Sequence, residues 1–112
     1  FKEHLLYFKI LGGRFIDHSK VEPFTSRLNP DSEIFSEPAD FTVKDELYIH
    51  DLEPDITVHY STEYEGEIVP TVWTRLYGEG RVFYAVPGHT QAAFQNEDFQ
   101  TILRKGLLWL CQ

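Results

Sequence analysis

The apolar and polar positions of the chain show their clearest strand pattern in residues 69–89. Residues 69–76 are rich in β-branched and aromatic side chains, and Gly78-Glu79-Gly80 supplies the glycines that a tight reversal needs. Residues 81–86 then form an almost continuous apolar run. Because a strand that faces water on one side alternates, this run predicts an interior strand covered on both faces. Pro87-Gly88-His89 ends the strand, and in open α/β sheets such a carboxyl edge is where ligands bind.

Weaker patterns predict further strands and the connections between them. They indicate strands at residues 21–29 and 56–60, and ordered structure from residue 41 that ends in a short strand through residue 50. The connections are turns at residues 29–32 and 51–55, a loop at residues 33–41, and an acidic hairpin tip at residues 63–67. The alternation around His59 places its side chain on an exposed strand face, and His50 is expected to lie similarly.

Two stretches have the spacing of helices. Residues 1–11 predict the end of a helix that Gly12-Gly13 stops. A clearer helix follows Asn96, a good N-cap with two acidic residues after it at the positive end of the helix dipole. The predicted apolar face of this helix comprises Phe99, Ile102, Leu103, Gly106, Leu107 and Leu110. Gly106 lowers helix stability in the middle of this face, so we expect a close approach to a sheet there.

These helices are too few for the predicted sheet. One helix remnant and one terminal helix do not cover both sides of a strand at residues 81–86. The first helix also has no capping residue in front of it, and Phe1 is not a natural start. We therefore expect residues 1–112 to be the C-terminal portion of a domain whose N-terminal strands and helices are absent.

Composition narrows the class of protein. The 112 residues suffice for one small domain, and 42% hydrophobic with 15% aromatic content can fill a core. Ten basic and eighteen acidic residues give a net charge of −8, which argues against a nucleic-acid or anionic-membrane partner. The single cysteine, Cys111, excludes an internal disulfide and a multi-cysteine zinc site, and its apolar neighbours predict that it is buried. No apolar run approaches membrane-spanning length, and we expect a cytoplasmic protein.

Several motifs, ordered along nearly the whole chain, carry a resemblance to a known family. They are Gly12-Gly13-Arg14-Phe15 with His18, Asp45-Glu46-Leu47-Tyr48, Pro70-x-x-Trp73-Thr74-Arg75-x-Tyr77-Gly78-x-Gly80-Arg81-Val82-Phe83-Tyr84, Gly88-His89, and Phe99 through Leu103-x-x-Gly106-x-x-Trp109. Together they resemble the trehalose-utilisation (ThuA-like) family. The resemblance implies an α/β fold of the class I glutamine amidotransferase-like superfamily. That fold is a flavodoxin-like three-layer sandwich, and this chain would form its C-terminal half, with a β-hairpin and a terminal helix.

The same resemblance makes a negative prediction about chemistry. Glutamine amidotransferases use a Cys nucleophile, a His after a late strand and a Glu two residues beyond that His. His89 stands where such a His would be, but Gln91 takes the place of the Glu and Cys111 is in the terminal helix. Because acyl transfer needs a thiolate and a carboxylate that orients the imidazole, amidotransferase activity is not expected.

Three polar residues on the family-matching motifs form the candidate catalytic set. His89 would be the general acid/base, with His18 and Glu46 completing the site. Arg14 and Tyr48 would bind the substrate. Two imidazoles and a carboxylate could also hold a divalent metal, but their spacing is not a local ligand motif, and we expect no metal and no cofactor.

Each candidate also has a structural interpretation. His18 could bond a backbone carbonyl, Glu46 could pair with Arg75 or Arg81, and His89 could cap a turn. Tyr48, Trp73 and Tyr84 could stack on a sugar ring, since aromatic side chains offer an apolar face and a polar tip. Trp73 and Tyr84 are expected in the core instead, because they lie inside the central hairpin.

Three functions remain open on this basis. The resemblance implies an enzyme of bacterial carbohydrate metabolism that acts on trehalose or an oxidised (keto) disaccharide. The missing nucleophile and orienting Glu favour a non-catalytic carbohydrate-binding or interaction module on the same scaffold. A third possibility is a homo-oligomer, or pairing with a chain that supplies the missing half, because an exposed apolar sheet face would drive association.

Overall fold

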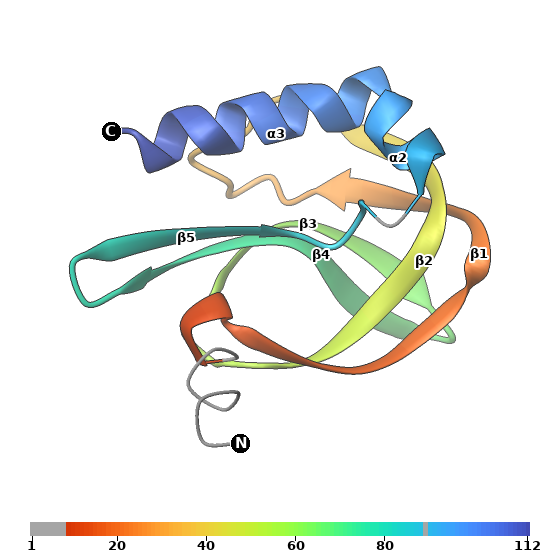
Figure 1. The fold of residues 1–112 in the computed structure, drawn as a ribbon, viewed down its shortest axis with the longest axis horizontal. Helices are drawn as coiled ribbons and strands as arrows, with labels where there is room; N and C mark the ends of the chain where they lie inside the picture. The colour runs from red at the N-terminus through yellow and green to blue at the C-terminus, as the bar shows by residue number, and fades with distance from the viewer. Residues whose placement is uncertain (1–8, 89) are drawn as a thin grey trace.

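The computed structural model of the chain describes residues 9–88 and 90–112 and has an α/β fold, with helices packed on a five-stranded antiparallel sheet (Figure 1). The strands are β1 (Gly13–Leu28), β2 (Asp40–Leu52), β3 (Thr57–Tyr64), β4 (Glu67–Tyr77) and β5 (Gly80–Ala85), and the helices are α2 (Gln91–Gln95) and α3 (Glu97–Leu110). The strand order is β2-β1-β3-β4-β5. Residues 1–8 of the predicted first helix, and His89, lie outside the described residues. None of the described helices is long and apolar enough to cross a membrane.

β1 is longer than the sequence pattern predicted. The pattern favoured a strand only from residue 21, whereas β1 begins at Gly13 and pairs with β2 along most of its length. Its register shifts twice between residues 15 and 21. These irregularities interrupt the two-residue period, so the first half of the strand does not alternate in sequence. The last two residues of β1, Arg27 and Leu28, pair with β3, and Arg27 also pairs with Asp40 of β2.

The hairpin predicted around residues 78–80 is confirmed. β4 and β5 pair antiparallel, from Val72 opposite Ala85 to Tyr77 opposite Gly80. The expectation that the second strand is interior is wrong, because β5 ends the strand order and pairs only with β4 among the described strands. Since the described pairings are all antiparallel, an argument from the carboxyl edge of a parallel sheet does not apply to these strands.

Two apolar clusters account for the continuous apolar run of β5. One cluster lies between the helices and the sheet and includes Phe41, Tyr60 and Phe99, with Phe83 and Ala85 packed against it. The other comprises Leu47, Val69, Trp73 and Val86, with Tyr84 packed against it. Alternate residues of β5 therefore contact different clusters, and the prediction that both of its faces are covered is confirmed.

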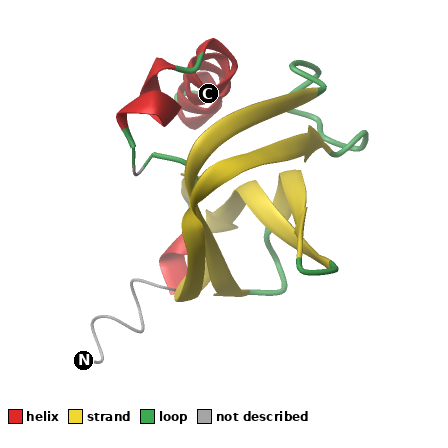
Figure 2. Ribbon diagram, turned by 90° about the vertical axis from the view of Figure 1, so that its right-hand side faces the viewer, coloured by secondary structure: helices red, strands yellow, loops and turns green. Residues whose placement is uncertain are grey.

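α2 and α3 lie together on one side of the sheet (Figure 2). Asn96 caps α3 as predicted, because its side-chain oxygen accepts the Phe99 N–H at 2.9 Å. A Cβ at Gly106 would lie 2.4 Å from the Phe83 ring, so the predicted close approach is also confirmed. Leu107, predicted for the buried face, is 60% exposed. A helix turns about 100° per residue, so seating α3 on Gly106 directs Leu107 away from the sheet.

The prediction that Cys111 is buried is wrong. α3 ends at Leu110, and Cys111 is an exposed free thiol at the C-cap. The apolar neighbours that suggested burial include Leu107 and Leu108, which are themselves exposed. The apolar stripe at this end of the helix is therefore not covered by the described part of the chain.

Candidate functional site

His18 and Glu46 come together on the neighbouring strands β1 and β2. The Nδ1 atom of His18 lies 2.9 Å from Oε2 of Glu46, and it also lies 2.7 Å from the backbone oxygen of Ser19. The register shift between His18 and Val21 lets the two side chains meet, because Val21 is the residue directly opposite Glu46. The pair is open to solvent, with 49% of the His18 side chain and 29% of the Glu46 side chain exposed.

This geometry decides between the structural interpretations of the two residues. His18 does bond a backbone carbonyl, as one interpretation held, but it faces the carboxylate at the same time. Glu46 pairs with His18 rather than with an arginine, since Arg75 bonds Asp55 and Arg81 bonds the backbone oxygen of Trp109. Both neighbours of Nδ1 are acceptors, so the hydrogen-bond network assigns the proton of a neutral imidazole to Nδ1. Nε2 is then the acceptor that His18 offers to a ligand.

Aromatic rings border the pair on one side. Tyr48 is the residue opposite His18 in the β1–β2 register, and the two ring centroids are 5.7 Å apart. The Phe15 ring lies 4.7 Å from the Tyr48 ring and 6.1 Å from the His18 ring, and the Phe15 residue is 41% exposed. An imidazole, a carboxylate and partly exposed aromatic faces therefore form one surface, which we call the His18 surface (His18, Glu46, Tyr48 and Phe15).

Arg14, the other predicted substrate-binding residue, is not at the centre of this surface. It is exposed near the start of β1 and lies opposite Asp51. Asp51 is three residues beyond Tyr48 on β2, which is about 10 Å along a strand. The structure thus brings His18, Glu46 and Tyr48 together and places Arg14 at the margin.

Asp45 is a residue that the sequence reasoning missed. Its side chain is fully buried, and its two oxygens accept backbone N–H groups, from Glu46 at 2.6 Å and from Gly88 at 2.8 Å. Thr90 donates its hydroxyl to the backbone oxygen of Lys44 at 2.8 Å. The residues on both sides of position 89 are therefore bonded to β2 beside Glu46. Position 89 itself lies outside the described residues.

Gly88 suits this attachment because its backbone has φ of 131°, a conformation that side chains disfavour. A Cβ at this position would also lie 3.3 Å from the Phe94 ring of α2. In the sequence, Pro87-Gly88-His89 predicts only the end of a strand. The pattern that could have revealed its partner is the alternation of Phe41, Val43, Asp45 and Leu47, which places a carboxylate on the buried face of β2.

Two other aromatic candidates are core residues, as expected. Trp73 is fully buried and stacks on Tyr84 with ring centroids 4.5 Å apart. His50, expected on an exposed face, is instead partly buried against both rings, and its Nε2 lies 3.0 Å from the Tyr84 hydroxyl. His50 also contacts Phe15 at 6.4 Å between centroids, so the core rings reach the His18 surface.

The expectation that His59 is exposed is wrong. His59 is 1% exposed, and its ring nitrogens lie 2.7 Å from the Ser32 hydroxyl and 2.8 Å from the Thr74 hydroxyl. The register of β3 against β4 shifts between Val58 and Tyr60, which changes the faces that the alternation assigned. Burial lowers the pKa of His59 from 6.5 to about 4, so the ring is neutral at neutral pH.

Comparison with protein families agrees with the motifs that these strands carry. A family model described as trehalose utilisation, ThuA, matches residues 1–110. The chain belongs to the ThuA family. Comparisons with curated proteins and with solved structures found no match.

The described residues of this ThuA-family chain also bear on metal binding and on acyl transfer. Within residues 9–88 and 90–112, no group of three or more His, Cys, Asp or Glu side chains is arranged to hold a metal ion. The His18 surface supplies one imidazole and one carboxylate. Cys111, the single cysteine, is exposed at the end of α3 and therefore does not belong to the His18 surface, which is formed by β1 and β2.

Proposed function

We propose that this ThuA-family chain takes part in bacterial carbohydrate metabolism and binds trehalose or a keto-disaccharide at the His18 surface. The observation that carries the proposal is the contact of His18 with Glu46 at 2.9 Å beside the Tyr48 ring. Sugars present hydroxyl groups around an apolar ring face, and this surface offers hydrogen-bond acceptors next to aromatic rings. The family match to trehalose utilisation supports a sugar as the ligand class.

In this proposal the chain's own residues divide the work. Glu46 and the Ser19 carbonyl keep the Nδ1 proton of His18 in place, so Nε2 accepts a hydrogen bond from a sugar hydroxyl. Tyr48 packs against the sugar ring, whereas Arg14, opposite Asp51, remains a prediction from the motif alone. His89 is the predicted general acid/base of this proposal.

The alternative is a carbohydrate-binding module without catalysis. It is favoured by the openness of the His18 surface, because 49% of the His18 side chain is exposed and enzymes exclude water from reacting groups. It is also favoured by Gln91, which stands where the amidotransferase-like pattern has an orienting Glu. The two functions differ in one observable, which is conversion of the bound sugar.

The test measures trehalose and keto-trehalose binding by calorimetry, with product analysis of the same samples. Replacing His18 by Ala or Glu46 by Gln is expected to weaken binding about tenfold, the effect of losing one or two hydrogen bonds. Glu67→Gln, which changes an exposed carboxylate on β4, is the matched control and should bind normally. Binding without conversion supports the module, and His89→Ala should abolish any conversion. Normal binding and turnover in both His18→Ala and Glu46→Gln would refute the site.

We also propose that a further layer of structure packs against α2 and α3. Exposed apolar side chains on the helices support this, because Phe94 is 53% exposed, Leu107 60% and Leu108 63%. The layer would come from a second copy or another chain. Light scattering that gives a clean monomer mass, at concentrations where binding is measured, would contradict association between copies.

A further inference from the structure

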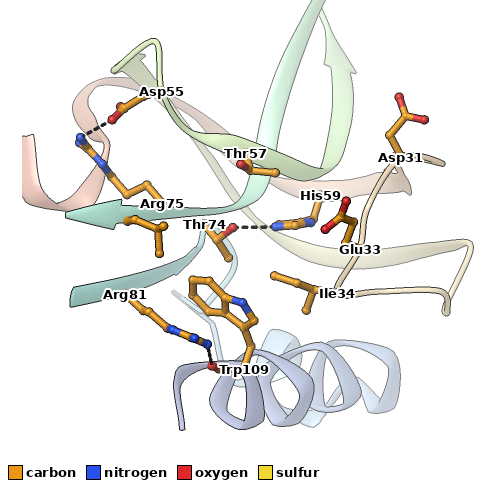
Figure 3. Close-up of a pocket in the computed structure, with 11 residues that line it drawn as sticks. Asp31, Glu33, Ile34, Asp55, Thr57, His59, Thr74, Arg75, Arg81 and Trp109 are labelled. Atoms are coloured by element: carbon orange, nitrogen blue, oxygen red, sulfur yellow. Dashed lines mark hydrogen bonds and ion pairs between the residues drawn. The ribbon is translucent and has the colours of Figure 1, made fainter. Parts of the chain in front are cut away.

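A cavity of about 610 Å³ lies away from the His18 surface, where β3 and β4 face the loop at residues 31–34 and the C-terminal end of α3 (Figure 3). Thr74 and His59 line its sheet side, Trp109 of α3 lines it from the helix, and Glu33 lines it from the loop. Its volume is within the range of about 300–1,000 Å³ that small-molecule sites occupy. Neither the sequence motifs nor the family match assigned a role to this group of residues.

Trp109 supplies the cavity with an aromatic wall that is held in place. The Arg81 guanidinium stacks on the indole with its carbon 5.1 Å from the ring centroid, and the same group donates to the Trp109 backbone oxygen at 2.7 Å. Figure 3 shows the indole directed from α3 toward Thr74, with Arg81 and Ile34 to either side. The indole is only partly buried, so part of it can contact a ligand.

The charges around the cavity nearly balance. Three carboxylates line it, from Asp31, Glu33 and Asp55, together with the guanidiniums of Arg75 and Arg81. Asp55 already neutralises Arg75 through a 2.9 Å ion pair. An anionic ligand would therefore meet the remaining carboxylates, whereas a neutral ligand with many hydroxyl groups can both donate to them and accept from the arginines.

Arg75 forms one charged edge of the cavity. Its side chain is only 9% exposed, and it donates to Asp55 and to the backbone oxygen of Lys9. Its buried Nε has no hydrogen-bond partner among the described residues. Because this atom is buried, Arg75 borders the cavity through its paired guanidinium and offers no free donor from Nε.

His59 has a positioning role at this cavity. Both of its ring nitrogens are engaged, by Ser32 of the loop and by Thr74 of β4. The Ser32 hydroxyl in turn accepts the Phe35 N–H at 3.1 Å. This chain of hydrogen bonds fixes the loop that carries Asp31 and Glu33 against the sheet, which keeps the cavity open in one shape.

We propose that this cavity is a second carbohydrate site, which binds a neutral saccharide with a sugar ring against Trp109. The inference deepens the proposed function, because it adds a site for the same ligand class on a different part of the fold. The aromatic wall would contact the apolar face of the ring. The carboxylates and guanidiniums around it would bond the hydroxyl groups.

The experiment titrates the protein with trehalose, glucose and the anionic sugar glucuronate. The chain has two tryptophans, so the part of the fluorescence change that is lost in Trp109→Leu, which retains the buried Trp73, reports Trp109; calorimetry measures the affinity. The neutral sugars are expected to bind more tightly than glucuronate. Trp109→Leu should lose the fluorescence change and weaken binding at this site about tenfold, and Glu33→Gln should weaken it about threefold.

Matched controls separate the cavity from its surroundings. Leu107→Ala alters an exposed residue on the same helix, and Glu79→Gln alters an exposed carboxylate in the β4–β5 turn, so both should bind normally. Circular dichroism melts verify that each variant is folded. Glu33 is exposed, so its variant tests the cavity even where replacement of Trp109 disturbs α3.

Each outcome has a definite meaning. If calorimetry shows weaker binding in both Trp109→Leu and Glu33→Gln while His18→Ala keeps the fluorescence change, the second site is supported. If His18→Ala abolishes sugar binding and the cavity variants bind normally, the cavity inference is overturned and the proposed function stands. If the cavity variants lose binding and His18→Ala retains full binding and turnover, the proposed function fails and the cavity site stands. Absence of a fluorescence change with all three sugars would also overturn the cavity site.

Discussion

Replacing Asp45 by Asn tests the connection between β2 and the segment around position 89. Both carboxylate oxygens of Asp45 accept backbone N–H groups, from Glu46 and Gly88. An amide has only one oxygen, so the Asn NH₂ group must face one of these donors and leave it unpaired in a fully buried position.

The magnitude follows from these two bonds. A hydrogen bond to a charged group contributes about 1.5–3 kcal/mol, and an unsatisfied buried donor costs about 1–3 kcal/mol. Since one of the two bonds survives as a neutral bond, Asp45→Asn should lower the free energy of unfolding by about 2–3 kcal/mol. Asp51→Asn, at an exposed position on the same strand, should change it by less than about 0.5 kcal/mol.

Urea denaturation of the two variants measures this difference, and amide hydrogen exchange locates it. The Gly88 amide should exchange faster in Asp45→Asn than in the unmodified chain, because its acceptor is weakened or lost. Equal unfolding free energies for the two variants, with unchanged Gly88 exchange, would refute the assignment of Asp45 as the anchor of this segment.

Three further predictions follow from the packing and the charges. Gly106→Ala should destabilise the fold by about 1–2 kcal/mol in thermal melts, because the clash with Phe83 outweighs the gain in helix propensity. Adding Phe83→Leu to this variant should recover part of the lost stability. A Gly106→Ala variant more stable than the unmodified chain would contradict the contact. His59 is protonated near pH 6.5 in the unfolded chain but only near pH 4 in the folded chain. Lowering the pH through this window should therefore reduce the free energy of unfolding by at most about 3 kcal/mol. The measurement compares the pH dependence of the unfolding free energy with that of His59→Gln, which should be less steep. Cys111 should react with a thiol reagent in the native state at the rate of an exposed cysteine, and reaction only after denaturation would show that it is covered.

Local sequence patterns predicted the local features of this fold well. The glycines of the hairpin, the N-cap Asn96 and the close approach at Gly106 each depend on the chemistry of one or a few neighbouring residues, and all three are confirmed. The pairing of His18 with Glu46 was proposed only through the family motifs. Nothing in their spacing predicts it, because their contact depends on an irregular β1–β2 register.

Features set by strand irregularities could not be predicted from the sequence. A shift in the β3–β4 register buries His59 together with Tyr60, where strict alternation requires that one of them face outward. The position of β5 at the sheet edge depends on long-range pairing, since its apolar run is equally consistent with a central strand. The cavity at Trp109 gathers residues from β3, β4, α3 and the 31–34 loop, so no single stretch of sequence reveals it.

The narrow joint between β1 and β3 has a consequence for how the chain opens. Among the described residues of β1, only Arg27 and Leu28 pair with β3, and these two residues form the joint. A buried hydrogen bond between Ser26 and Thr71 lies next to it. The sheet therefore divides into a β1–β2 ribbon that carries the His18 surface and a β3–β4–β5 meander that forms the sheet side of the Trp109 cavity. Such halves can unfold as separate cooperative units, and the two helices connect them because α2 and α3 contact β2 and α3 also contacts β5. Opening at this joint would separate the 31–34 loop from the meander and disrupt the Trp109 cavity, while the β1–β2 pairing that holds the His18 surface stays intact.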